Sequence, residues 1–257
     1  MWLPGDISIW LIALCITAAF LAGFVDAVAG GGGLIQLPTL LVAFPSAPLA
    51  TVMGTNKSIS IIGTSAAANT YRRRIPADRR VLVLMLIFAF LGSFAGSALV
   101  TFVDRTVFEP IILVILIGVA IFTIKNPTFG QSEKSLKSNH KLKATLIATG
   151  IGFYDGLIGP GTGMFLLFAL VSVLGATFLQ ASATAKFVNV ATNAASLAIF
   201  IPGGHVLWAL TLLMAPANLL GGVIGARTAI GKGSYFVRAI FMVMISVLII
   251  RFIVTLT

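Results

Sequence analysis

The chain has 257 residues, of which 58% are hydrophobic and 9% are charged, and its formal net charge is +10. A water-soluble domain carries roughly 25% charged residues, so this composition excludes an ordinary soluble protein and indicates a membrane protein. The positive charge does not indicate a nucleic-acid partner, because basic residues held on the cytoplasmic side of a membrane protein give the same sum.

Ten apolar stretches follow one another along the chain. They lie at about 7–29, 34–45, 49–70, 81–101, 107–124, 143–159, 163–178, 181–201, 206–226 and 236–256. The first has no basic segment before it, so we expect a transmembrane span there rather than a cleaved signal peptide. Stretches 34–45 and 163–178 are short for an untilted crossing of a ~30 Å hydrocarbon core. The sequence leaves open whether these two cross fully or re-enter.

The two halves of the chain match at a fixed shift of 129 residues. The string GFVDAVAGGGG at 23–33 returns as GFYDGLIGPGTG at 152–163, which aligns Asp26 with Asp155, and the same shift aligns Lys57 with Lys186. Chance among many glycines does not explain why an aspartate pair and a lysine pair share one offset. We therefore predict a duplication, with residues 1–129 as the first repeat and 130–257 as the second, and a basic linker that begins at about 125.

Equivalent loops of the two halves differ in charge. The loop at 72–80 carries five arginines, whereas its counterpart at 201–209 has no Lys or Arg. By the positive-inside rule the halves then enter the membrane in opposite senses. Five crossings per half produce that inversion, whereas re-entrant short segments would leave four and strand one basic loop outside. We predict an all-α polytopic transmembrane bundle of two inverted repeats, each of about five helices.

The basic loops indicate which side faces the cytoplasm. The segments at 71–80, 125–143 and 227–238 hold thirteen of the seventeen Lys and Arg residues. In the five-crossing arrangement all three segments lie on one side of the membrane, so we expect that side to be cytoplasmic.

The glycine strings predict broken helices. We expect one helix to end at Gly30–Gly33 and the next to start at Leu34, with a second break at Gly159–Gly163 before Met164. A helix start at membrane depth offers unpaired N–H groups and a positive dipole end to an anion, and such breaks in an inverted repeat indicate a transporter site. The GxxxG glycines favour helix packing instead: Gly92, Gly96, Gly221 and Gly225.

The intramembrane charges allow more than one interpretation. A lysine facing lipid is costly, so Lys57 and Lys186 either bind an anion in a cavity, reach the interface, or pair with Asp26 or Asp155. The aspartates could bond to the broken backbone, pair with a lysine, or carry a coupling proton.

The candidate residues follow from these motifs. Those proposed to bind substrate are Lys57, Lys186, Asn56, Thr55, Gly31, Gly32, Gly33, Gly161, Thr162, Gly163, Gln36, Asn189 and Asn193. Those with a coupling or structural role are Asp26, Asp155 and Tyr154.

An enzyme is not expected. Two membrane aspartates are typical of intramembrane aspartyl proteases, and Tyr154-Asp155 matches half of their motif, but a GxGD string is absent. The aspartates sit at repeat-equivalent positions, which symmetry explains without chemistry. Cys15 is the only cysteine, and His140 and His205 lie in separate loops, so no metal site or cofactor is expected.

The motifs resemble a known family. The two glycine strings, TNK at 55–57 and TAKFVNVATN at 184–193 are similar to the sulfite exporter TauE/SafE (TSUP) family of bacterial membrane transporters, over nearly the whole chain. The resemblance implies a multi-pass protein of the bacterial inner membrane. It also implies a secondary transporter for small sulfur-containing anions such as sulfite, sulfonates, sulfoacetate or thiosulfate. The second string reads GPGTG where the first has GGGG, so the half-sites differ.

Several points stay open at this stage. An anion channel is the second interpretation and an intramembrane aspartyl hydrolase the third. The expected partners are a small anion and the lipid bilayer, with no nucleic acid. The exact substrate, the direction of transport and the coupling ion are undetermined, and so is the oligomeric state, for which a homodimer is one option.

Overall fold

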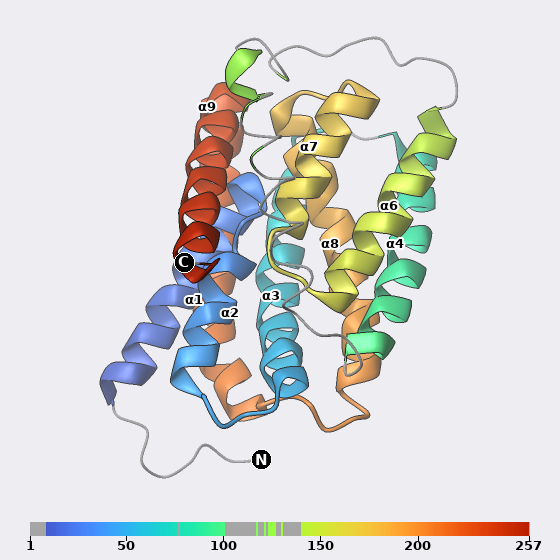
Figure 1. The fold of residues 1–257 in the computed structure, drawn as a ribbon. Coiled ribbons are helices and arrows are strands. Elements are labelled where there is room, and N and C mark those ends of the chain that lie inside the picture. Colours follow the sequence, from blue (N-terminus) through green and yellow to red (C-terminus); the bar gives the residue numbers. More distant parts are fainter. Residues whose placement is uncertain are drawn as a thin grey trace.

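The computed structural model describes residues 9–76, 78–100, 117, 121, 123–126, 130 and 140–256. These residues form helices and no strands, which confirms the all-α prediction (Figure 1). The predicted stretch at 107–124 and the linker at 125–143 lie largely outside them. The helices are α1 (Ile9–Ala29), α2 (Gly33–Ala43), α3 (Leu49–Arg72), α4 (Arg79–Leu99), α6 (His140–Leu157), α7 (Thr162–Leu174), α8 (Phe178–Phe200) and α9 (Trp208–Leu256).

Among the described residues, three segments are long and apolar enough to span a bilayer. They are Ile9–Ala29, Arg79–Leu99 and Trp208–Val247. The long helices α3 and α8 carry the polar residues of the candidate site along their buried faces, which lowers their mean hydropathy. The fold is therefore that of a helical membrane protein whose central helices are the more polar ones.

The helix starts repeat along the chain with the offset seen in the sequence. Helices α2 and α7 begin at Gly33 and Thr162, α3 and α8 begin at Leu49 and Phe178, and α4 and α9 begin at Arg79 and Trp208, each pair 129 residues apart. The helix packing has the same relation between the halves. Helix α1 of the first half packs along α9 of the second, and its counterpart α6 packs along α4 of the first. Each half thus covers the first helix of the other.

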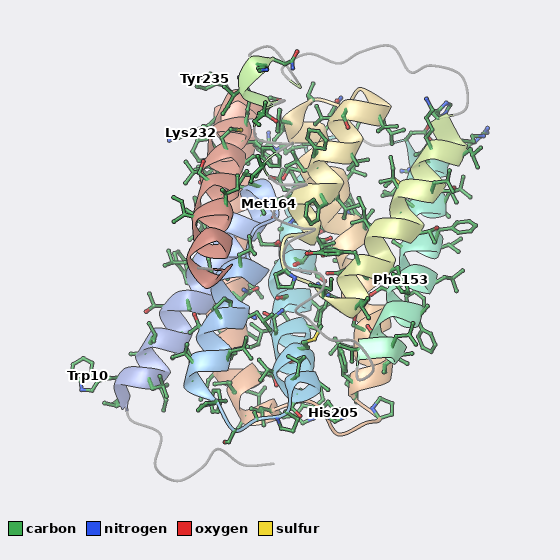
Figure 2. The ribbon with its side chains drawn as sticks, in the orientation of Figure 1. Trp10, Phe153, Met164, His205, Lys232 and Tyr235 are labelled. Atoms are coloured by element: carbon green, nitrogen blue, oxygen red, sulfur yellow. The ribbon has the colours of Figure 1, made fainter. Side chains whose placement is uncertain are left out.

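Corresponding helices run in opposite directions. Figure 2 places Trp10 and His205 at the lower end of the bundle and Lys232 and Tyr235 at the upper end. Helix α3 starts beside His205, whose Nδ1 lies 3.2 Å from the Thr51 hydroxyl, and runs upward, whereas α8 runs downward to the same loop (Figure 1). Helix α9 runs upward as far as Gly233, whose φ of 74° and ψ of −170° interrupt it.

The breaks at the two glycine strings lie at the positions expected to within two residues. Helix α1 ends at Ala29 and α2 begins at Gly33, while α6 ends at Leu157 and α7 begins at Thr162. Helices α2 and α7 have 11 and 13 residues, or about 16 and 20 Å of length, which is less than a ~30 Å hydrocarbon core. In Figure 1, α2 runs from mid-height to the lower end and α7 from mid-height to the upper end.

The two breaks touch each other. A Cβ atom on Gly30 would lie 2.3 Å from the carbonyl carbon of Gly163, and one on Gly163 would lie 2.4 Å from the Gly30 Cα. Gly30 also has a φ of 82°, which side-chain-bearing residues rarely adopt. Glycine at these positions is therefore required for the backbones of the two halves to meet.

Glycines also bring α4 and α6 into contact. A Cβ on Gly92 would meet the Thr149 carbonyl oxygen at 2.4 Å, and one on Gly96 would meet the Phe153 carbonyl oxygen at 2.2 Å. Gly221 and Gly225 approach α1 in the same way. The GxxxG glycines are thus packing residues, as predicted, and their close approach lets the membrane helices gain van der Waals contact.

The basic residues gather at one end of the bundle. Arg73 and Arg74, which follow α3, line the same pocket as Arg227 and Gly231 of α9. The connections at the opposite end, 44–48 and 201–207, contain no Lys or Arg. The arginine cluster after Tyr71 and the stretch around Lys232 therefore lie at the same end, which an inverted arrangement of the halves requires.

We predict that Gly152→Ala lowers the melting temperature of the purified protein, because the new Cβ would lie 2.5 Å from the Ala89 carbonyl oxygen of α4. Overpacking of this kind costs about 1–3 kcal/mol. Gly150→Ala is the matched control, since its Cβ meets nothing within 4 Å and alanine favours a helix by up to ~1 kcal/mol. Equal losses in a thermal unfolding assay would contradict the packing described for α4 and α6.

Candidate functional site

The first buried charge pair joins α3 to α6. The Lys57 Nζ lies 2.6 Å from Asp155 Oδ2, and the two side chains are 5% and 6% exposed. The other carboxylate oxygen of Asp155 accepts a hydrogen bond of 2.7 Å from the Thr162 hydroxyl, at the start of α7. Asp155 thus links a lysine of the first half to the broken backbone of the second.

The second pair joins α8 to α1. The Lys186 Nζ lies 2.9 Å from Asp26 Oδ2 and also donates to the Asp26 backbone carbonyl at 2.5 Å. The Lys186 side chain is 0% exposed, whereas that of Asp26 is 19% exposed. Asp26 Oδ2 accepts a further hydrogen bond of 3.2 Å from the Thr64 hydroxyl.

The two charge pairs are related by the 129-residue shift, which aligns Lys57 with Lys186 and Asp26 with Asp155. Each lysine pairs with the aspartate of the opposite half, so both pairs cross between the halves. An unpaired charge buried away from water is strongly unfavourable, and the crossed pairs remove that cost for four groups at once. Among the described residues these are the salt bridges that the structure contains.

A cavity of about 40 Å³ lies between the pairs and the glycine breaks. A water molecule needs roughly 10–15 Å³ by a comparable measure, so the space holds a few waters or a small ion. Its lining residues come from both halves: Asp26, Gly30, Gly33, Asn56, Lys57, Ser60, Thr64, Asp155, Gly159, Gly161, Thr162, Gly163, Asn189 and Asn193. Met164, in the first turn of α7, marks the level of the break between the two ends of the bundle (Figure 2).

Two amides on the cavity wall lack a side-chain hydrogen bond within the described residues. Asn189 and Asn193 are both buried on this wall. The Asn189 Oδ1 atom is fully buried without a partner among the described residues. Both lie on the same face of α8, four residues apart. Buried amides are normally hydrogen-bonded, so their presence here indicates groups kept available for a ligand or water.

A separate amide network lies on the first-half side of the cavity. Gln36 donates to Asn56 Oδ1 at 2.9 Å, and Asn218 donates to Gln36 Oε1 at 3.1 Å and to the Ala19 carbonyl at 2.9 Å. This network ties α2 to α3 and α9. It also satisfies the polar groups of Gln36 within the protein, so Gln36 supports Asn56 rather than facing the cavity.

Several predicted site residues do not line the cavity. Lys186 points into its pair with Asp26, and Thr55 donates to the Thr51 carbonyl at 2.7 Å. The Tyr154 hydroxyl donates to the Pro160 carbonyl at 2.6 Å, which braces the second break. The remaining members of this group are Gln36, Gly31 and Gly32.

The structure adds four residues that the sequence prediction did not include. Ser60 and Thr64 line the cavity, as do Gly30 and Gly159. Ser60 and Thr64 are the repeat counterparts of Asn189 and Asn193, so the 129-residue shift could have found them. Gly30 and Gly159 begin the two predicted glycine breaks, which was the signal for them.

Within the described residues, no cluster of three or more His, Cys, Asp or Glu side chains could hold a metal ion. What the arrangement offers is a small polar cavity at mid-height in a helical membrane bundle, with one lysine and several neutral donors on its wall. Such broken-helix sites between repeats are characteristic of membrane transporters.

Comparison with known proteins supports this class. The Sulfite exporter TauE/SafE family matches residues 15–252, and the chain belongs to that family. A relative from Haemophilus influenzae, named "Probable membrane transporter protein", is 34% identical over 93% of each chain. The relative YfcA of Escherichia coli K12, which carries the same description, is 33% identical over 94% of this chain and 89% of its own.

A third relative, from Sinorhizobium, is 33% identical over 96% of this chain and 94% of its own and is named a membrane transporter protein as well. No solved structure matches the chain significantly. The protein is therefore a membrane transporter of the TauE/SafE family, as the sequence motifs predicted.

We predict that Lys186→Met strongly destabilises the protein, because it leaves the Asp26 carboxylate without its cation. Removing one partner of a buried pair costs about 3–5 kcal/mol, whereas removing both charges together is often nearly neutral. The double variant Lys186→Met/Asp26→Asn should therefore recover most of the melting temperature. If the melting-temperature losses of Lys186→Met and of Asp26→Asn simply added in the double variant, the pairing would not be the source of the effect.

Proposed function

We propose that the protein carries small sulfur-containing anions, of the sulfite, sulfonate, sulfoacetate or thiosulfate class, by alternating access. The observation that carries the proposal is the cavity wall itself, where Lys57 stands with Asn189 and Asn193. The Asn189 Oδ1 atom is buried there without a hydrogen-bond partner among the described residues. The family description, which names sulfite export, supports the substrate class.

The donor set suits a compact oxyanion. The Lys57 ammonium supplies three N–H donors and a positive charge, and each asparagine amide supplies two N–H donors. The hydroxyl of Ser60 adds a neutral donor on the same wall, whereas that of Thr64 already donates to Asp26. A sulfite or sulfonate group presents three oxygen acceptors on one sulfur, so it could accept from the lysine and both amides at once.

Charge balance in the cavity constrains how an anion binds. Lys57 and Asp155 neutralise each other in the structure, so an incoming anion must displace the carboxylate or find it protonated. A proton on Asp155 would release Lys57 to the anion, and proton and anion would then move together. The titratable groups on the cavity wall are Asp26, Lys57 and Asp155, which makes Asp155 our candidate coupling residue.

The glycine contact offers a way to change access. Helices α2 and α7 start at the cavity and run to opposite ends of the bundle (Figure 1). Their breaks meet at Gly30 and Gly163 without side chains between them, so one short helix could tilt away while the other stays closed. Rocking of one repeat against the other around a fixed central site is the general route in such folds.

The family supports a proposed location, and the charge distribution supports a proposed orientation. We place the protein in the bacterial inner membrane as a multi-pass protein, with the end that carries Arg73, Arg74 and Arg227 in the cytoplasm. An aspartyl hydrolase is disfavoured, because its two carboxylates share a proton, whereas Asp26 and Asp155 each bind a different lysine.

Transport by purified protein in liposomes tests the proposal. Labelled sulfite or labelled sulfoacetate should enter with saturating kinetics and should exchange faster when unlabelled anion is present on the opposite side. Large single-channel currents without saturation would favour an anion channel. If neither anion moves under any proton or sodium gradient, the substrate class is wrong.

We predict that Asn193→Ala lowers anion uptake by about tenfold or more with little change in melting temperature, because the lost amide lines the cavity and makes no side-chain hydrogen bond within the described part of the chain. Asn218→Ala is the contrasting variant. It removes hydrogen bonds to Ala19 and Gln36 and should lower the melting temperature. Uptake that survives intact in folded Asn193→Ala would exclude this amide from the substrate site.

A further inference from the structure

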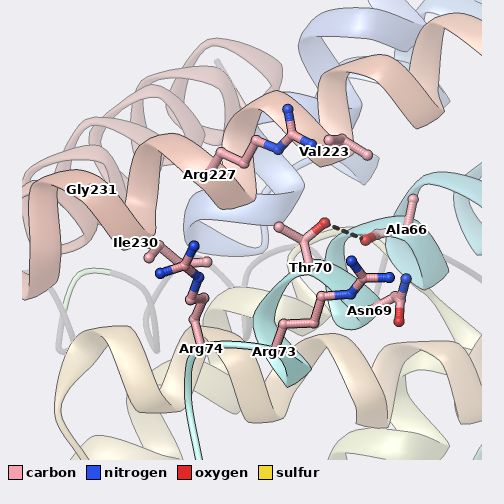
Figure 3. Close-up of a pocket in the computed structure, with 9 residues that line it drawn as sticks. All are labelled: Ala66, Asn69, Thr70, Arg73, Arg74, Val223, Arg227, Ile230 and Gly231. Carbon is pink, nitrogen blue, oxygen red and sulfur yellow. Dashed lines mark hydrogen bonds between the residues drawn. The ribbon is translucent and has the colours of Figure 1, made fainter.

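A second pocket, of about 690 Å³, lies at the basic end of the bundle between α3 and α9. Figure 3 shows Arg73 and Arg74 on the α3 side of the pocket and Arg227 on the α9 side. This pocket shares no lining residue with the central cavity.

The pocket lies off the path defined by the central site. On α3, Lys57, Ser60 and Thr64 share the face that lines the central cavity. Ala66 follows Thr64 by two residues, which rotates it by about 200° around the helix, and it lines the second pocket instead. The two sites therefore occupy opposite faces of the same helix, so the second pocket is not an antechamber on the substrate face.

The positive charge of this pocket is not neutralised by the described protein. The salt bridges of the described residues are those of Lys57 and Lys186, and no described carboxylate lies within 4.0 Å of the guanidinium groups of Arg73, Arg74 or Arg227. Three exposed arginines on two walls of one pocket therefore form a site for a polyoxygenated anion. Guanidinium groups suit phosphate in particular, because their planar N–H donors match two phosphate oxygens.

The surroundings favour a phosphate that belongs to a lipid. The wall between the arginines includes the half-buried apolar residues Val223 and Ile230. Leu220 and Ile224 precede Arg227 by seven and three residues, so they share its face of α9, and both are exposed. An apolar stripe that leads to an arginine at the end of a membrane helix fits an acyl chain below a phosphate.

We propose that the pocket between α3 and α9 binds the phosphate of an anionic phospholipid. Basic pockets between membrane helices on the cytoplasmic side commonly bind acidic headgroups, and here the lipid would bridge α3 of one half to α9 of the other. This site is separate from the transported anion, and it does not depend on the proposed substrate.

Native mass spectrometry of the full-length protein in detergent tests the proposal, with phosphatidylglycerol and phosphatidylcholine as probes. The wild type should retain phosphatidylglycerol over phosphatidylcholine. The variant Arg73→Gln/Arg74→Gln/Arg227→Gln should bind phosphatidylglycerol more than about tenfold less tightly, since each interfacial arginine contributes about 1 kcal/mol. The matched control Arg79→Gln/Arg80→Gln/Lys232→Gln removes the same charge from the same end of the bundle, outside the pocket, and should bind as the wild type does.

Two outcomes would overturn the proposal. One is equal phosphatidylglycerol binding by the pocket variant and the control. The other outcome comes from a thermal unfolding assay with inorganic phosphate and with phosphatidylglycerol. If both ligands raise the melting temperature equally and the phosphate effect disappears in the pocket variant, the site binds a free anion rather than a lipid. If the triple variant does not fold, Arg227→Gln compared with Arg79→Gln carries the test, with an expected weakening of about fivefold.

Discussion

The two crossed lysine–aspartate pairs are the interaction on which the rest of the structure depends. Each brings a charge from one half of the chain to the opposite charge of the other half, at a depth where neither could remain alone. They tie α3 to α6 and α8 to α1 across the two halves. Gly30 and Gly163, whose backbones touch, line the same cavity as three of the four charged residues.

The pairs are related by the repeat, but their environments differ. Lys186 is fully buried and makes two contacts with Asp26, one of them to the backbone, and it does not reach the cavity. Lys57 lines the cavity and contacts one carboxylate oxygen of Asp155. The second pair therefore acts mainly as a clamp between the halves, and the first is the one an anion can reach. The helix starts of the two halves recur 129 residues apart, but the surroundings of the two charge pairs differ.

The sequence predicted the helix boundaries at the two glycine strings well, because local residue types determine where a helix ends. Consecutive glycines end helices, so both breaks were located to within two residues. The shared offset of the Asp and Lys pairs is also the offset at which the helix starts recur. Which lysine pairs with which aspartate depends on how α1, α3, α6 and α8 pack, and local sequence does not determine this. The sequence also could not predict the hydrogen-bond network of Gln36, Asn56 and Asn218. The repeat gives no signal for it, because the counterparts of these residues cannot form such a network: they are Phe165, Ala185 and Ala89.

Our central claim is that the transported anion binds the ammonium group of Lys57, which is paired with Asp155 in the structure. A thermal-shift titration with sulfite and sulfoacetate tests it most directly, comparing the wild type with the charge-neutral variant Lys57→Gln/Asp155→Asn. A ligand that binds the folded state raises its melting temperature by mass action, so the wild type should show a rise that saturates. The folded variant should show none. An equal, saturating rise in the variant would mean that the anion binds elsewhere and would contradict the account.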